Sequence, residues 1–123
     1  MLLDSNIIIY AAQPQREGLR QFIAEHGPAV SLVSYVETLG YHRLNGAERQ
    51  FLVTFFEAAE ILPISRAVAE QAISLRQVRR MSLGDALIAG TALVHKRPLV
   101  THNSQDFDWI SDLAIIDPIA SLE

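Results

Sequence analysis

The sequence predicts an α/β fold in which helices cover a central, mostly parallel sheet of four to five strands. Short apolar runs alternate along the chain with segments whose apolar residues recur at every third or fourth position. Strands that alternate with helices in this way form parallel sheets with right-handed crossovers. The length suits one domain, so we expect residues 1–123 to form a single unit.

The first half of the chain supplies two of the expected strands. Strands are expected at residues 1–3 and 29–33, and helices at 15–26, 34–44 and 47–59. Residues 7–10 are apolar and β-branched, and their pattern leaves open whether they extend the first strand or begin a helix. Pro28 interrupts the helical pattern before the second strand. Ser34 is placed to cap the following helix, and Gly46 separates that helix from the next.

The second half supplies the remaining strands and the most apolar helix. Strands are expected at 61–64, 99–101 and 114–116, helices at 66–80 and 83–95, and a loop or single helical turn at 103–109. Pro63 indicates that the third strand lies at an edge of the sheet. The helix opened by Ser82 is apolar nearly all round, so it should be buried. Its several alanines and Gly90 allow close packing.

The composition excludes several classes of protein. Half of the residues are hydrophobic and 20% are charged, which is too apolar for a disordered chain. We expect a cytoplasmic protein with no membrane partner, because no apolar run approaches the ~18 residues of a membrane helix and no signal peptide is evident. The absence of cysteine excludes disulfides, zinc fingers and thiol catalysis. The net charge of −4 disfavours binding of nucleic acid by bulk charge alone.

Four acidic residues fall at or near the carboxyl ends of predicted strands, where open parallel sheets bind their ligands. Asp4 ends the first strand, and Glu37 lies in the helix after the second. Asp85 lies in the first turn of the buried helix, and Asp106 follows the fourth strand by a few residues. We expect these four side chains to converge on one edge of the sheet.

Converging carboxylates need compensation. Two of them about 4 Å apart repel by roughly 4 kcal/mol at an effective dielectric near 20. A shared proton or a divalent cation relieves this repulsion. Mg²⁺ and Mn²⁺ prefer oxygen ligands and often use one or two carboxylates, with water and substrate phosphate completing the shell. Such a site suits hydrolysis of a phosphodiester.

A purely structural explanation remains open at this point. Glu37 follows Ser34 by the three residues of a capping box. Asp85 follows Ser82 at the same spacing. Acids in first helical turns also complement the helix dipole, for about 0.3–1 kcal/mol. Asp4 is harder to explain in this way, because a charge that ends an apolar run is unfavourable to bury.

Four motifs in this chain resemble those of PIN-domain ribonucleases. They are Met1-Leu2-Leu3-Asp4-Ser5-Asn6, Ser34-Tyr35-Val36-Glu37, Ser82-Leu83-Gly84-Asp85-Ala86 and Leu99-Val100-Thr101-His102-Asn103-Ser104-Gln105-Asp106-Phe107. Each motif alone is weak, but four in this order cover essentially the whole chain. The small single-domain format resembles the VapC toxins of bacterial toxin–antitoxin pairs.

The resemblance implies a fold, an activity and partners. The fold is a Rossmann-like α/β/α sandwich, in which residues 7–10 begin a helix. The activity is a Mg²⁺- or Mn²⁺-dependent endoribonuclease, in which a water activated by the cation attacks an RNA phosphodiester. The partners are the RNA substrate, a VapB-like antitoxin and a second copy in a homodimer.

The resemblance also assigns roles to single residues. Asp4 and Asp85 are the leading metal ligands, and Glu37 binds the metal directly or through water, or orients the attacking water. Asn6 supports Asp4 by a hydrogen bond, and Thr101 supplies a supporting hydroxyl.

The fourth acidic position is ambiguous in this sequence. Asn103 stands where family members place an aspartate, and Asp106 follows three residues later. An asparagine ligates through its carbonyl without adding negative charge, so one metal or two remain open.

Two other functions are weighed against the nuclease. A receiver-like, Mg²⁺-binding regulatory module fits poorly, because residues 2–5 hold a single acid and Lys96 precedes the fourth strand. A catalytically inactive PIN-like binding partner is consistent with Asn103, but three intact acids argue against it.

Some other side chains have both a functional and a structural explanation. The candidates for phosphate contacts are Arg76, Arg79, Arg80, Lys96 and Arg97, whose alternative is an ordinary solvated face. Trp109 suits stacking on a base or packing under its loop. Phe51, Phe55 and Phe56 suit the core or a groove for an antitoxin helix. His102 suits proton transfer or an exposed loop.

Overall fold

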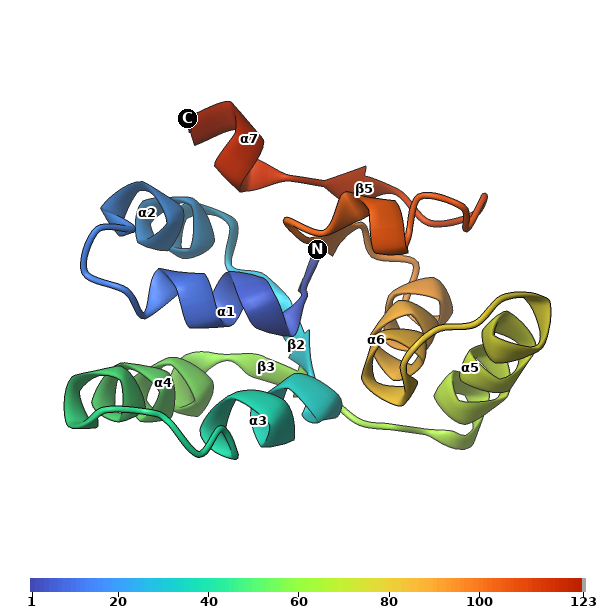
Figure 1. The fold of residues 1–123 in the computed structure, drawn as a ribbon, viewed down its shortest axis with the longest axis horizontal. Coiled ribbons are helices and arrows are strands. Elements are labelled where there is room, and N and C mark those ends of the chain that lie inside the picture. Colours follow the sequence, from blue (N-terminus) through green and yellow to red (C-terminus); the bar gives the residue numbers. More distant parts are fainter. Residues whose placement is uncertain (123) are drawn as a thin grey trace.

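The computed structural model describes residues 1–122 and contains a five-stranded sheet in the order β3-β2-β1-β4-β5 (Figure 1). The strands are β1 Leu2–Leu3, β2 Ala29–Ser31, β3 Glu60–Leu62, β4 Leu99–Val100 and β5 Ile115–Ile116. Every pairing is parallel, which confirms the predicted α/β class. The strand before Pro63 lies at the edge, as its proline predicts.

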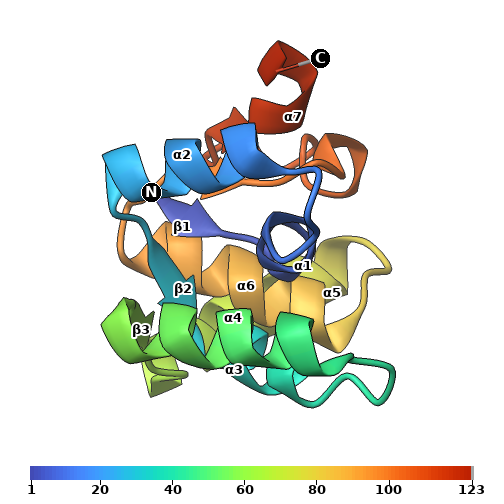
Figure 2. The same ribbon diagram turned by 90° about the vertical axis from the view of Figure 1, so that its left-hand side faces the viewer.

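Helices cover both faces of this sheet. They are α1 Ser5–Ala11, α2 Glu17–His26, α3 Leu32–Leu39, α4 Gly46–Ala58, α5 Arg66–Val78, α6 Leu83–Val94 and α7 Pro118–Leu122, with a 3₁₀ turn at Ser104–Asp106. In Figure 2, β1 runs between α2 on one side and α6 on the other. No helix within residues 1–122 is long and apolar enough to cross a membrane.

Alternation along the strands builds two cores. One buried cluster contains Leu2, Ala29 and Leu99, and the other contains their chain neighbours Leu3, Val30 and Val100. Successive side chains of a strand point to opposite faces, so each strand contributes to both clusters. The first core is closed by α5 and α6, and the second by α1, α2, α4 and α7. The strands are therefore buried on both faces and lead their carboxyl ends to a common edge.

The helix predicted at residues 34–44 begins and ends earlier than expected. Ser31 ends β2 with extended backbone, and its hydroxyl accepts a hydrogen bond from the Val33 amide at 3.1 Å. The strand therefore passes directly into α3, and Ser34 is a buried helical residue instead of the cap. The prediction was wrong because the apolar run continues unbroken across the junction. This shift places Glu37 one turn further along its helix than expected.

Helix α6 is buried and closely packed, as predicted. Ser82 caps it, since its hydroxyl accepts a hydrogen bond from the Asp85 amide at 3.1 Å. A Cβ added at Gly90 would lie 2.8 Å from the backbone oxygen of Val68, so α5 and α6 approach each other at backbone distance. This packing holds Asp85 at the amino end of a helix that cannot shift freely.

The final helix, α7, has no counterpart in the sequence prediction. The Asp117 carboxylate accepts hydrogen bonds from the amides of Ile119 and Ala120 at 3.1 and 3.3 Å. Pro118 occupies the first helical position, where its missing N–H is no loss. Asp117-Pro118, read as the end of the fifth strand, is therefore also the start of a helix.

Candidate active site

Asp4 is held at the end of β1 by donors from two neighbouring segments. Its Oδ1 accepts a hydrogen bond from the Ser5 amide at 2.8 Å, which caps α1. Its Oδ2 accepts a hydrogen bond from the Thr101 hydroxyl, also at 2.8 Å, at the end of the adjacent strand β4. The side chain is only 5% exposed. Its carboxylate is thus fixed at the carboxyl edge of the sheet.

Thr101 is oriented by its own partner. The Asn103 amide donates to the Thr101 hydroxyl oxygen at 3.0 Å. This contact occupies a lone pair and leaves the single hydroxyl proton for Asp4. Thr101 is therefore oriented to donate to Asp4, and its supporting role in the site stays a prediction.

Glu37 reaches across from α3 to α1. The Ser5 hydroxyl lies 2.8 Å from Glu37 Oε1 and 2.9 Å from the Ser34 hydroxyl. A hydroxyl has one proton and a carboxylate only accepts, so Ser5 donates to Glu37 and accepts from Ser34. The Glu37 carboxylate is thus engaged by the residue that follows Asp4, which argues against a capping box with Ser34.

Gly84 makes room for this carboxylate. A Cβ built on Gly84 would lie 2.6 Å from Glu37 Oε2 and 3.2 Å from its carboxyl carbon. Glu37 therefore lies against the first turn of α6, next to Asp85. The sequence motifs predict no separate role for Ser5 or Gly84, although both residues stand beside predicted acids. Adjacency to an acid is a signal that could have singled them out.

The acids share one electrostatic environment. Burial, and less strongly the charges of Asp85 and Glu37, raise the pKa of Asp4 to about 6, against hydrogen bonds from Thr101 and Ser5 that lower it. Burial also raises the pKa of Asp85, and next in size the charge of Asp106 does the same, with a smaller effect from Glu37. The four predicted acids therefore influence one another, as their positions at one edge require.

The cluster fits a cation bound through a few ligands. Within residues 1–122, no three acidic or histidine side chains form a ready-made metal cage. The donors are all oxygen, and Asn6 Oδ1, two residues beyond Asp4, is buried without a hydrogen-bond partner in the described part of the chain. An unpaired buried acceptor and mutually repelling carboxylates suit a hard divalent cation held by one or two carboxylates plus water.

Asp106 and Asn103, the two candidates for the fourth acidic position, differ in their relation to the other acids. Asp106 lies in the 3₁₀ turn, and its negative charge raises the pKa of Asp85. Asn103 instead contacts the site through its backbone amide, which donates a hydrogen bond to the Thr101 hydroxyl oxygen. His102 turns to Asp117, with its Nδ1 3.1 Å from that carboxylate.

A parallel α/β sheet with an oxygen-rich acidic cluster at its carboxyl edge defines a class of proteins suited to metal-assisted chemistry on phosphate. Within that class, the chain belongs to the PIN domain family, which matches residues 1–113. PIN domains are typically nucleases and generally use divalent metal ions. No curated protein sequence matches the chain.

Solved structures agree with this family. The chain resembles a toxin–antitoxin complex from Klebsiella pneumoniae, with 29% identity, a TM-score of 0.73, and coverage of 95% of this chain and 96% of that chain. It resembles FitAcB from Neisseria gonorrhoeae with 25% identity, a TM-score of 0.76, and coverage of 96% of this chain and 97% of that chain. VapBC2 from Rickettsia felis, bound to a DNA fragment from its promoter, shares the fold at 23% identity and a TM-score of 0.79, with coverage of 94% and 96%.

Proposed function

We propose that this chain is a Mg²⁺- or Mn²⁺-dependent endoribonuclease and the toxin of a toxin–antitoxin pair. The observation that carries the proposal is the coupled acidic cluster at the carboxyl edge of the sheet. Asp4 lies at its buried end, and its pKa is raised by burial and by the charges of Asp85 and Glu37. Clustering of like charges that no structural need explains is typical of a functional site.

In this proposal each acid has a defined task. Asp4 and Asp85 hold the cation, and Asp106 completes the site at its exposed side. The cation, when bound, supplies positive charge to the phosphate oxygens and acidifies water in its shell. Glu37 binds the cation directly or through water, or orients the attacking water.

Ser5 and Thr101 keep the two most constrained carboxylates in position. Each donates one proton, Ser5 to Glu37 and Thr101 to Asp4, at 2.8 Å. Side chains held in this way need little rearrangement when substrate arrives, which lowers the barrier to reaction.

The proposal includes partners. The chain is similar to structures of toxin–antitoxin assemblies, which supports a VapB-like antitoxin and a homodimer in the cytoplasm. A groove of about 520 Å³ between α2 and α4 has Ile23, Phe51 and Phe55 among its walls, and suits an antitoxin helix. Phe56, in contrast, is buried in the core.

The direct test uses purified chain with a circular single-stranded RNA and a circular single-stranded DNA. We expect the RNA to be opened in Mg²⁺ or Mn²⁺, with no cleavage in EDTA, because only an internal cut opens a circle. Equal cleavage of the DNA would contradict the choice of RNA. A folded protein that cuts neither circle would favour the inactive PIN-like binding partner.

Gly84→Ala should disable the site without unfolding the chain. The added Cβ would overlap Glu37 Oε2, at 2.6 Å, so the carboxylate must swing away and lose the Ser5 proton. Displacing a reacting group by about an ångström lowers rates on the order of 10²-fold. The measurement is the rate of RNA cleavage together with the melting temperature, which should fall little because alanine suits a helix.

Gly46→Ala is the matched control. Gly46 opens α4, and a Cβ added there meets nothing within 4 Å. Cleavage should be unchanged in this variant. If Gly84→Ala cleaves RNA as fast as Gly46→Ala, the position of Glu37 does not matter to the reaction.

A further inference from the structure

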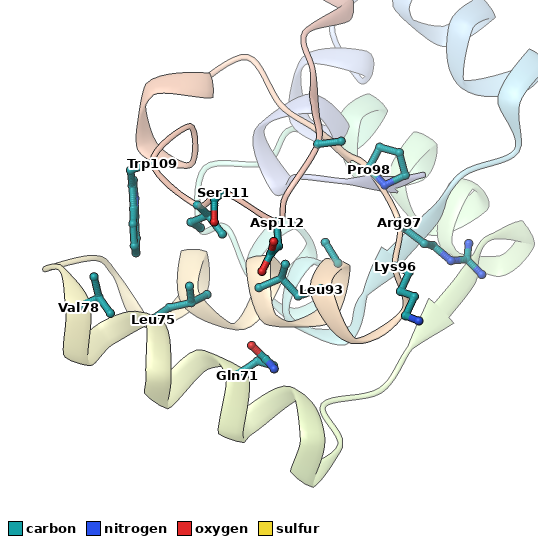
Figure 3. A pocket seen from close by; sticks show the side chains of 13 residues that line it. Gln71, Leu75, Val78, Leu93, Lys96, Arg97, Pro98, Trp109, Ser111 and Asp112 are labelled. Carbon is teal, nitrogen blue, oxygen red and sulfur yellow. The ribbon is translucent and has the colours of Figure 1, made fainter.

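A groove with a volume of about 660 Å³ lies beside α5 and α6 (Figure 3). Figure 3 shows Trp109 at one end, Lys96 and Arg97 at the other, and Gln71, Leu75 and Val78 along α5 between them. We call this the Trp109 groove. Its volume is in the range of pockets that hold small organic ligands, the size of a nucleotide unit.

The Trp109 end of this groove adjoins the acidic cluster. The indole Nε1 of Trp109 donates a hydrogen bond to the backbone oxygen of Asp106 at 3.1 Å. Asp106 is the acid whose charge reaches Asp85. A ligand in the groove would therefore begin at the loop that carries Asp106 and run toward the carboxyl end of α6.

Lys96 and Arg97 line one end of the groove, Arg79 lies over the Trp109 ring at the other, and one carboxylate, Asp112, lines the wall between them (Figure 3). The guanidinium carbon of Arg79 lies 5.5 Å from the centre of the Trp109 ring. Among residues 1–122, neither Arg79 nor Lys96 forms an ion pair, whereas Arg97 is paired with Glu60 at 3.0 Å. A chain of net charge −4 whose site is acidic needs such cations to attract a polyanion.

We propose that the Trp109 groove binds a single-stranded segment of the RNA substrate next to the position of cleavage. One base stacks on Trp109, Arg79 contacts a phosphate beside it, and Lys96 contacts a phosphate further along. Stacking on an aromatic ring combined with a cationic track is how proteins hold unpaired nucleotides. The inference rests on the proposed function, because it gives the RNA substrate a binding groove. Trp109 and Arg79 would then be positioning residues outside the acidic cluster.

The test uses Trp109 as its own probe, because it is the only tryptophan in the chain. Purified chain is titrated with a short single-stranded RNA in EDTA, where cleavage does not interfere, at low and at physiological salt. We expect a saturable change in Trp109 emission, with weaker binding at the higher salt. RNA integrity is checked after the titration, and cleavage by the same protein is measured separately in Mn²⁺.

Two variants assign the binding to the groove. Arg79→Ala should weaken RNA binding about 5–10-fold and reduce the salt slope by about one, while Trp109 remains as probe. Arg66→Ala is the control, because Arg66 begins α5, the helix that ends just before Arg79, has a side chain 93% exposed, and pairs with Glu70. In the cleavage assay, Arg79→Ala and Trp109→Ala should raise KM with little change in kcat, and Trp109→Phe should restore KM because it retains a stacking ring.

The outcomes separate the two proposals. Cleavage of RNA with no change in Trp109 emission overturns the groove and leaves the nuclease. A change in emission without cleavage supports the groove and overturns the nuclease. If there is neither a change in emission nor cleavage, both proposals are overturned. The groove is also overturned if Arg66→Ala weakens binding as much as Arg79→Ala. If Trp109 emission changes with the protein concentration and not with the RNA concentration, the groove is an interface between copies of the chain, and the RNA proposal is overturned.

Discussion

Asp4→Asn is expected to abolish RNA cleavage, lowering its rate by about 10²–10³-fold or more. The substitution keeps the size of the side chain and an oxygen that can accept one of the two hydrogen bonds from Ser5 and Thr101. It removes the negative charge at the most buried position of the cluster. A cation held by only one or two carboxylates loses a large share of its binding energy when one becomes neutral.

The measurement is the rate of RNA cleavage in saturating Mn²⁺, together with a circular dichroism spectrum to show that the fold persists. Glu25→Gln is the matched control, because it removes an exposed carboxylate on α2, where Glu25 contacts only Gln21 in the described structure. That variant should cut RNA at the parental rate. Parental cleavage by Asp4→Asn would exclude the proposed mechanism.

The positions of the acids could be predicted because they depend on chain direction alone. Each parallel strand leaves the sheet at the same edge, so an acid that directly follows an apolar run must lie there. Asp4 follows β1, and Asp85 lies in the first turn of α6, as their sequence neighbours indicate. The edge position of β3 was likewise readable from Pro63, which cannot donate to a ladder.

The contacts between those acids could not be predicted, because they depend on how helices pack. Ser5 and Glu37 are 32 residues apart, and their hydrogen bond requires α1 and α3 to meet at one rotation. The space at Gly84 exists only because α6 approaches α3. The junction between β2 and α3 at Ser31 could not be predicted, because a short apolar strand and the start of an apolar helix have similar residue compositions.

The acidic cluster is also expected to lower the stability of the chain at neutral pH when no divalent cation is present. The folded-state pKa of Asp4 is about 6, against an ordinary value of 3.8. The folded chain therefore binds more protons than the unfolded chain between these values. The free energy of unfolding falls as the pH rises from about 4 to about 6, by about 3 kcal/mol at most from Asp4 alone.

Asp4→Asn isolates this contribution. In EDTA at pH 7 the variant should be more stable than the parent by about 1–2 kcal/mol, because it loses a buried charge and weakens one hydrogen bond. The gap should close as the pH falls to about 3, below both pKa values, where Asp4 is mostly protonated in the folded and in the unfolded chain. The measurement is urea unfolding of both proteins across this range, with Glu25→Gln expected to follow the parent throughout.

Divalent cation should reverse the order of stability. A cation that binds the folded chain at one hundred times its Kd stabilises it by about 2.7 kcal/mol. At pH 7, Mg²⁺ or Mn²⁺ should therefore raise the unfolding midpoint of the parent and leave that of Asp4→Asn nearly unchanged. If Asp4→Asn is less stable than the parent in EDTA at pH 7, the hydrogen bonds from Thr101 and Ser5 outweigh burial and repulsion. The ionised Asp4 carboxylate would then stabilise the fold by itself, and the acidic cluster would not need a cation at this residue.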